Sequence, residues 1–144
     1  MEAETTKTVL LVDDEPMVRD LGNEILRSYG YQVVLACDGL EALEIYENNG
    51  KEIDLVILDL LMPNLGGKET LVRLRELDPA AKVIICSGYG SRGNGLQQII
   101  TSKINMVHKP FKPEELVFAV RQTLDGKTVT YQNRADLTGE TIAM

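Results

Sequence analysis

The chain has 144 residues and a net charge of −7, with 22 acidic against 15 basic residues. This acidic balance argues against direct binding of nucleic acid, which requires a basic surface, but it suits a cation site or a basic partner. No apolar stretch approaches the ~20 residues of a membrane span, and the polar start MEAETTK does not resemble a secretory signal. We therefore expect a cytoplasmic protein that does not bind a membrane.

The first part of the chain alternates strand and helix patterns. TVLLV (8–12) is short and β-branched, which predicts a buried strand, and apolar residues at helical spacing follow it. YQVVLA (31–36) predicts a second strand. Asp38 and Glu41 then form a capping-box pattern, which predicts the start of a helix that closes near Gly50.

The remainder of the chain continues this alternation up to a C-terminal stretch without periodicity. The last helix should begin at Pro113, because proline is favoured in the first helical turn. In chain order we expect a strand over 54–58, a helix from about Lys68 that ends before Pro79, a strand over 82–87, a short helix over about 96–103, a strand over 105–109 and the helix from Pro113. This alternation predicts an α/β fold with a parallel sheet covered by helices on both faces.

Polar residues finish four of these strands, at the edge where a doubly wound sheet binds its ligands. They are Asp13 and Asp14 after the first strand, Asp59 after the third, Ser87 at the end of the fourth and Lys109 at the end of the fifth. Two carboxylates ~4 Å apart repel by about 4 kcal/mol at an effective dielectric constant of ~20, so three should attract a cation or share a proton. Ligands that offer only oxygen favour Mg²⁺ or Mn²⁺.

The same set of side chains suits phosphoryl chemistry. A metal ion, a lysine and a hydroxyl donor around one carboxylate form a pocket for a phosphoryl group. Asp59 would then be the nucleophile and would form an aspartyl phosphate.

Four segments together resemble the receiver domain of two-component response regulators. They are VLLVDDEP (9–16), VILDLLMPNLGG (56–67), CSG (86–88) and KPF (109–111). The resemblance implies a flavodoxin-like fold of five parallel strands in the order 2-1-3-4-5 with five helices. It also implies a receiver domain over 7–125, with an N-terminal extension over 1–6 and a flexible C-terminal tail over 126–144.

The resemblance further implies a role for each residue of the site. Asp59 would accept a phosphoryl group from a phosphohistidine, and Ser87 and Lys109 would contact that group. The metal ion would be held by Asp14 directly, by Asp13 through water, by Asp59, and by the backbone carbonyl of Leu61. The Lys109–Pro110 peptide bond is expected to be cis.

The implied partners are a sensor histidine kinase or a histidine phosphotransfer protein. The surface made by helix four, strand five and helix five would change its protein contacts on phosphorylation, and a homodimer through this surface is possible. The domain would thus act as a signalling switch and not as an enzyme.

Three positions depart from the usual receiver pattern. Met106 occupies the place of the aromatic residue that normally moves with the hydroxyl residue, so we expect switching to rely on Ser87 and on the glycine-rich segment 88–95. Leu61 and Tyr89 stand at two positions that tune the phosphoryl lifetime in the family, and both are bulky and do not position a water molecule for attack. We therefore expect slow self-dephosphorylation.

Other interpretations remain open from the sequence alone. A Mg²⁺-dependent phosphohydrolase with an aspartate nucleophile would want a second acid two residues after Asp59, where Leu61 stands. A receiver-like scaffold without phosphorylation is a further alternative, and Asp13–Asp14 could simply cap a helix. The strand order places Cys37 and Cys86 roughly 14 Å apart, too far for a disulfide, so both should be free thiols.

Overall fold

The sheet has the predicted order. The computed structural model describes residues 6–62, 64–88 and 104–128. Five parallel strands are hydrogen-bonded in the order β2-β1-β3-β4-β5. They are β1 (Thr8–Val12), β2 (Gln32–Ala36), β3 (Leu55–Asp59), β4 (Val83–Ser87) and β5 (Asn105–His108).

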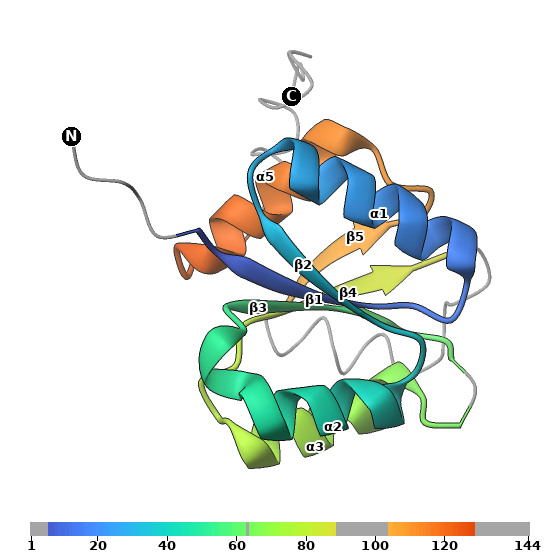
Figure 1. The fold of residues 1–144 in the computed structure, drawn as a ribbon, viewed down its shortest axis with the longest axis vertical. Coiled ribbons are helices and arrows are strands. Elements are labelled where there is room, and N and C mark those ends of the chain that lie inside the picture. The colour runs from blue at the N-terminus through green and yellow to red at the C-terminus, as the bar shows by residue number, and fades with distance from the viewer. Residues whose placement is uncertain (1–5, 63, 89–103, 129–144) are drawn as a thin grey trace, which may run out of the picture.

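Helices cover both faces of the sheet. The described helices are α1 (Pro16–Ser28), α2 (Gly39–Asn49), the short 3₁₀ helix η1 (Gly50–Glu52), α3 (Gly67–Leu77) and α5 (Pro113–Leu124). Figure 1 shows α1 and α5 on one side and α2 and α3 on the other. The helix expected over 96–103 lies outside the described residues, as do residues 1–5 of the N-terminal extension and residues 129–144 of the tail.

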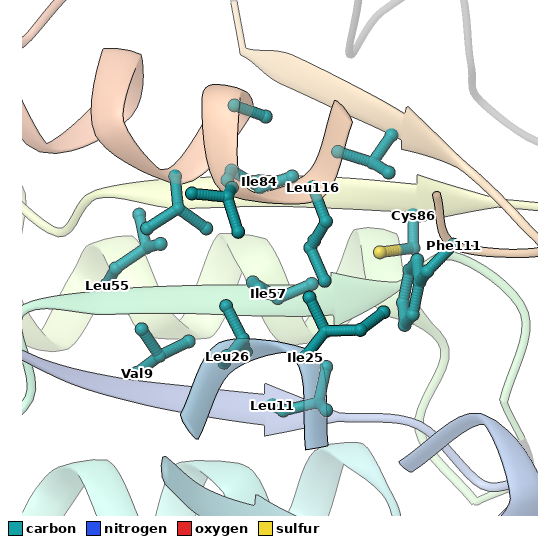
Figure 2. Close-up of a cluster of buried hydrophobic side chains, with 14 of the residues drawn as sticks. Val9, Leu11, Ile25, Leu26, Leu55, Ile57, Ile84, Cys86, Phe111 and Leu116 are labelled. Carbon is teal, nitrogen blue, oxygen red and sulfur yellow. The ribbon is translucent and has the colours of Figure 1, made fainter. Parts of the chain in front are cut away.

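The sheet divides the hydrophobic core into two layers. Alternate residues of one strand point to opposite faces, so Val9 and Leu11 of β1 pack toward α1 and α5, while Leu10 and Val12 pack toward α2 and α3. Figure 2 shows the first of these layers, where Leu116 of α5 meets Ile57 of β3. Burial on both faces explains why the central strands read as uninterrupted apolar runs.

Two sequence predictions need small corrections. Asp59 is the last residue of β3 and not the residue after it, so its carboxylate projects from the strand itself. The spacing of Leu71, Leu74 and Leu77 predicts that all three lie on or near one face of α3, but Leu77 is 48% exposed. Three-residue steps rotate the side chain by about 60° each, which carries Leu77 away from the buried face.

The helix start at Asp38 follows the predicted capping pattern. The Asp38 side chain accepts a hydrogen bond from the backbone N–H of Glu41 at 2.8 Å. The Glu41 carboxylate accepts one in return at 2.6 Å, from the N–H of Cys37, one residue before the cap. Cys37 is an exposed free thiol and Cys86 a buried one, which confirms the expectation from the strand order.

A glycine packs α3 directly against the end of β3. A Cβ atom on Gly67 would overlap the carbonyl oxygen of Asp59 and lie 2.7 Å from the Cα of Leu60, and both are backbone atoms that cannot easily move. The neighbouring Gly66 has nothing within 4 Å of its Cβ position, and its φ of −67° is open to alanine.

We expect Gly67→Ala to lower the free energy of unfolding by about 1–3 kcal/mol, the usual cost of overpacking. Gly66→Ala should change it by less than about 1 kcal/mol. Urea unfolding of both variants checks this. Equal stability of the two would show that the α3–β3 contact is not as tight as described.

Candidate functional site

The three aspartates meet at the carboxyl ends of β1 and β3. These strands are neighbours, with Val12 paired to Leu58, so Asp13 and Asp59 emerge side by side. Asp13 is 1% exposed and Asp59 is 3% exposed. One carboxylate oxygen from each of Asp13, Asp14 and Asp59 lies within 4.8 Å of the others. The placement that the sequence predicted is therefore observed, and it is an oxygen-only donor set of the kind that Mg²⁺ and Mn²⁺ prefer.

Lys109 supplies the positive charge of this site. Its Nζ donates to Asp13 Oδ2 at 3.0 Å and lies 3.3 Å from Asp59 Oδ1. It is also 3.9 Å from the carboxylate of the exposed Glu15. The Lys109–Pro110 peptide bond is cis, as expected. The sequence predicted that Lys109 faces Asp59, but its closer bond to Asp13 was not foreseen.

The charges and burial shift the acidity of two groups. Burial raises the pKa of Asp59 to about 7, and the charge of Asp13 adds to this, while Lys109 and the backbone N–H of Leu61 oppose it. For Lys109, burial lowers the pKa, but the hydrogen bond to Asp13 and the charge of Asp59 outweigh this and leave the pKa raised. Lys109 therefore carries its charge at neutral pH, whereas Asp59 is poised to lose or gain a proton.

The acidic cluster opens into a surface hollow beside Leu61, which is 48% exposed. Asp14, Glu15, Val18, Asp59, Leu61, Gly88, Lys109 and Pro110 line this hollow. A ligand in it would contact the Asp59 carboxylate, Lys109 and the loop after β3.

The loop after β3 is fastened at several points. The N–H of Leu60 donates to the carbonyl of Cys86, and the N–H of Gly67 donates to the carbonyl of Leu60, both at 3.0 Å. Asn64 has a positive φ of 67°, a conformation that asparagine tolerates better than most residues. Its side-chain amide donates to Asp38 at 3.0 Å, which ties this loop to the start of α2. No local sequence pattern predicts this contact of Asn64, because it joins two loops that are distant along the chain.

Ser87 is buried, and its hydroxyl contacts His108. Ser87 ends β4 and is 3% exposed, and its Oγ lies 3.2 Å from His108 Nδ1. Ser87 therefore lies at the strand end that the sequence predicts, but its contact with His108 is not apparent from the sequence pattern. The register of β4 and β5, which sets Ser87 opposite His108, is the signal that could have found this pair.

Comparison with known proteins defines the family. Residues 9–121 match the model of the response regulator receiver domain. The chain is 34% identical over 119 residues to the chemotaxis protein CheY of Thermotoga maritima, covering 81% of this chain and 96% of that protein. It is 40% identical over 118 residues to the sensor kinase CckA of Brucella abortus, covering 82% of this chain but only 12% of that protein.

A solved structure agrees with these matches. A chain of the CheX–CheY–BeF₃–Mg²⁺ complex from Borrelia burgdorferi superposes with a TM-score of 0.74 at 28% identity, covering 81% of this chain and 87% of that one. The chain belongs to the response regulator receiver family. It is a phosphoacceptor signalling domain of two-component systems, a class that is generally not enzymatic. Within the described part of the chain, no helix has the length and apolar character needed to cross a membrane.

Proposed function

We propose that Asp59 is the phosphoacceptor of this domain and that the phosphoryl group comes from a phosphohistidine. Asp59 supports this role because it lies at the junction of the acidic cluster, the lysine and the open hollow. Burial raises the pKa of Asp59 to about 7, so its negative charge is costly in the free protein. Binding of a cation, or reaction with an electrophile, would reduce this cost.

A divalent cation, Mg²⁺ or Mn²⁺, fits the donor set of this site. Asp14, Asp59 and the carbonyl of Leu61 would hold it directly, and Asp13 would act through water. The indirect role for Asp13 is supported by its two occupied oxygens, one bonded to Lys109 and the other to the N–H of Glu15 at 2.9 Å. When bound, the cation would neutralise charge on the carboxylates and on the phosphoryl oxygens.

The chain's own groups have distinct tasks in the transfer. An Asp59 carboxylate oxygen attacks phosphorus, the P–O bond forms as the P–N bond of the donor breaks, and the leaving imidazole keeps the electron pair. Lys109 stays within reach of the acceptor and balances the negative charge of the phosphoryl group. Ser87 can donate its hydroxyl hydrogen to a phosphoryl oxygen once it turns away from His108.

Receiver domains interact with histidine kinases and phosphotransfer proteins, and this chain fits the same partners. We place its output on the surface of helix four, strand five and helix five, with a possible homodimer there and no direct binding of nucleic acid. We also place the domain in the cytoplasm and assign the receiver unit to residues 7–125, between the extension over 1–6 and the tail over 126–144.

Intact-mass analysis after incubation with acetyl phosphate and Mg²⁺ tests the proposed chemistry. The mass should rise by one phosphoryl group, and chelation of Mg²⁺ should prevent the rise. A phosphohydrolase would instead consume the donor repeatedly without retaining the group. The apolar Leu61, two residues after Asp59, offers no acid to support that second outcome.

The phosphorylated domain is expected to lose its phosphoryl group slowly. Leu61 stands at the rim of the hollow and cannot position a water molecule for attack on phosphorus. Tyr89, the second position on which this prediction rests, lies outside the described residues. The decay of the phosphorylated mass after removal of the donor measures the lifetime. A half-life of seconds would contradict the prediction, and Leu61→Asn, which introduces a polar side chain, should shorten the half-life.

A further inference from the structure

The bond between Ser87 and His108 joins the ends of two neighbouring strands. Ser87 and His108 are register partners in the parallel pair β4–β5. The N–H of Lys109 donates to the carbonyl of Ser87 at 2.8 Å, and the preceding residues Cys86 and Val107 are also register partners, so the backbone is paired on either side of the contact. We therefore expect a change in the contact between Ser87 Oγ and His108 Nδ1, which lie 3.2 Å apart, to come from side-chain rotation.

A serine hydroxyl has one hydrogen and can donate it to one acceptor at a time. When Nδ1 of the neutral imidazole is the acceptor, the hydroxyl cannot donate to a phosphoryl oxygen on Asp59. The imidazole and the phosphoryl group then compete for the same hydrogen. A net hydrogen bond to a neutral group corresponds to roughly a two- to tenfold effect on an equilibrium.

His108 is the polar side chain of β5 that faces Ser87. Successive side chains of a strand alternate between faces, so His108 shares its face with Met106, while Asn105 and Val107 point the other way. Met106 packs with the apolar layer that also holds Ile85. Its thioether is at most a weak hydrogen-bond acceptor, so the imidazole is the stronger competitor for the Ser87 hydroxyl.

We propose that His108 is a positioning residue that retains the Ser87 hydroxyl in the free protein and releases it on phosphorylation. The inference rests on the proposed function of Asp59 and adds a hydrogen bond that stabilises the unphosphorylated state. Loss of the imidazole acceptor should make the phosphorylated conformation easier to reach. It follows that the environment of His108 reports the state of Asp59.

The chain offers a direct spectroscopic test, because it contains a single histidine and its ring signals need no assignment. Beryllofluoride with Mg²⁺ serves as the phosphoryl probe, and its binding is followed by ¹⁹F NMR. On binding, the ¹⁵N shift of the imidazole Nδ1 should change in the wild type. In Ser87→Ala, the free protein should already show the altered shift, and the probe should leave it unchanged.

The affinity for beryllofluoride shows whether His108 acts through the Ser87 hydroxyl or only supports the fold. His108→Leu should bind beryllofluoride roughly two- to tenfold more tightly than the wild type. His108→Asn retains a side-chain acceptor and should bind like the wild type. In a Ser87→Ala background, the His108→Leu substitution should have no effect on affinity, because the two residues act through one bond.

The outcomes distinguish the role of Asp59 as phosphoacceptor from the role of His108 as a positioning residue. Beryllofluoride that fails to bind the wild type would overturn both the proposed function and this inference. Beryllofluoride that binds while the imidazole signal stays constant would overturn the inference alone. Equal or weaker binding by His108→Leu, or the same affinity change in the Ser87→Ala background, would also overturn it and leave the role of Asp59 intact.

Discussion

An Asp59→Asn variant is expected to take up no phosphoryl group from acetyl phosphate and Mg²⁺. The amide lacks the carboxylate oxygen that attacks phosphorus, and it is a weaker ligand for a hard cation. Intact-mass analysis measures the loss directly. Asp20→Asn, on an exposed position of α1, is the matched control and should be phosphorylated like the wild type. Uptake of a phosphoryl group by Asp59→Asn at the wild-type level would show that another residue is the acceptor.

The same variant should be more stable than the wild type without metal at alkaline pH. The folded-state pKa of Asp59 is about 7, against about 4 in the unfolded chain. The folded protein therefore tolerates the protonated carboxyl of Asp59 better than the charged one. The corresponding contribution to the free energy of unfolding is fully present below pH ~4 and is lost as the pH rises through about 7. Asparagine avoids that loss, so Asp59→Asn should gain about 1–2 kcal/mol at about pH 8, and the gain should shrink toward pH ~5.

Urea unfolding across this pH range, in the presence of a chelator, checks the sign. A variant that is less stable than the wild type at about pH 8 would show that Lys109 compensates the buried charge fully. Mg²⁺ should narrow the difference, because it binds the folded wild type and stabilises it by mass action.

Replacing Lys109 with methionine should have the second large effect. The Nζ atom lies 3.0 Å from Asp13 and 3.3 Å from Asp59, two carboxylates that are almost fully buried. Without this cation, the buried carboxylates remain uncompensated, a change that commonly costs about 3–5 kcal/mol. We expect a loss of about 2–4 kcal/mol at about pH 8, with slower phosphorylation by acetyl phosphate.

Lys68→Met is the matched control for this variant, since Lys68 is exposed on α3. Its stability should stay within about 0.5 kcal/mol of the wild type. Lowering the pH below about 7 should reduce the loss in Lys109→Met, because Asp59 then takes up a proton instead of repelling Asp13. A Lys109→Met protein as stable as Lys68→Met would mean that the ion pairs carry little of the fold's stability.

Most of the fold followed from local patterns in the sequence. Buried strands on both faces of a parallel sheet leave uninterrupted apolar runs such as residues 55–58, and the aspartate that ends such a run is conspicuous. Pro113 and the Asp38–Glu41 pair mark helix starts by chemistry that acts within a few residues. The convergence of Asp13 and Asp59 followed from a different argument, because the strands of a doubly wound sheet bring their carboxyl ends to one edge.

The features that were missed depend on contacts between distant segments. The bond from Ser87 to His108 requires the register of β4 and β5, and the link from Asn64 to Asp38 requires the packing of two loops. Lys109 was expected beside Asp59, yet its closer partner is Asp13. Local periodicity does not reveal these side-chain contacts, because they form only when distant helices, strands and loops pack together.

The two free cysteines give the domain a built-in attachment point for a spectroscopic label. Cys86 is enclosed in the sheet, where burial raises the pKa of its thiol, while Cys37 is exposed just beyond β2. The N–H of Asp13 donates to the carbonyl of Ala36 at 3.1 Å, so the exposed thiol of Cys37 lies on the chain next to the acidic cluster. One fluorophore could therefore be coupled to the natural protein without mutagenesis, close enough to sense when the pocket fills.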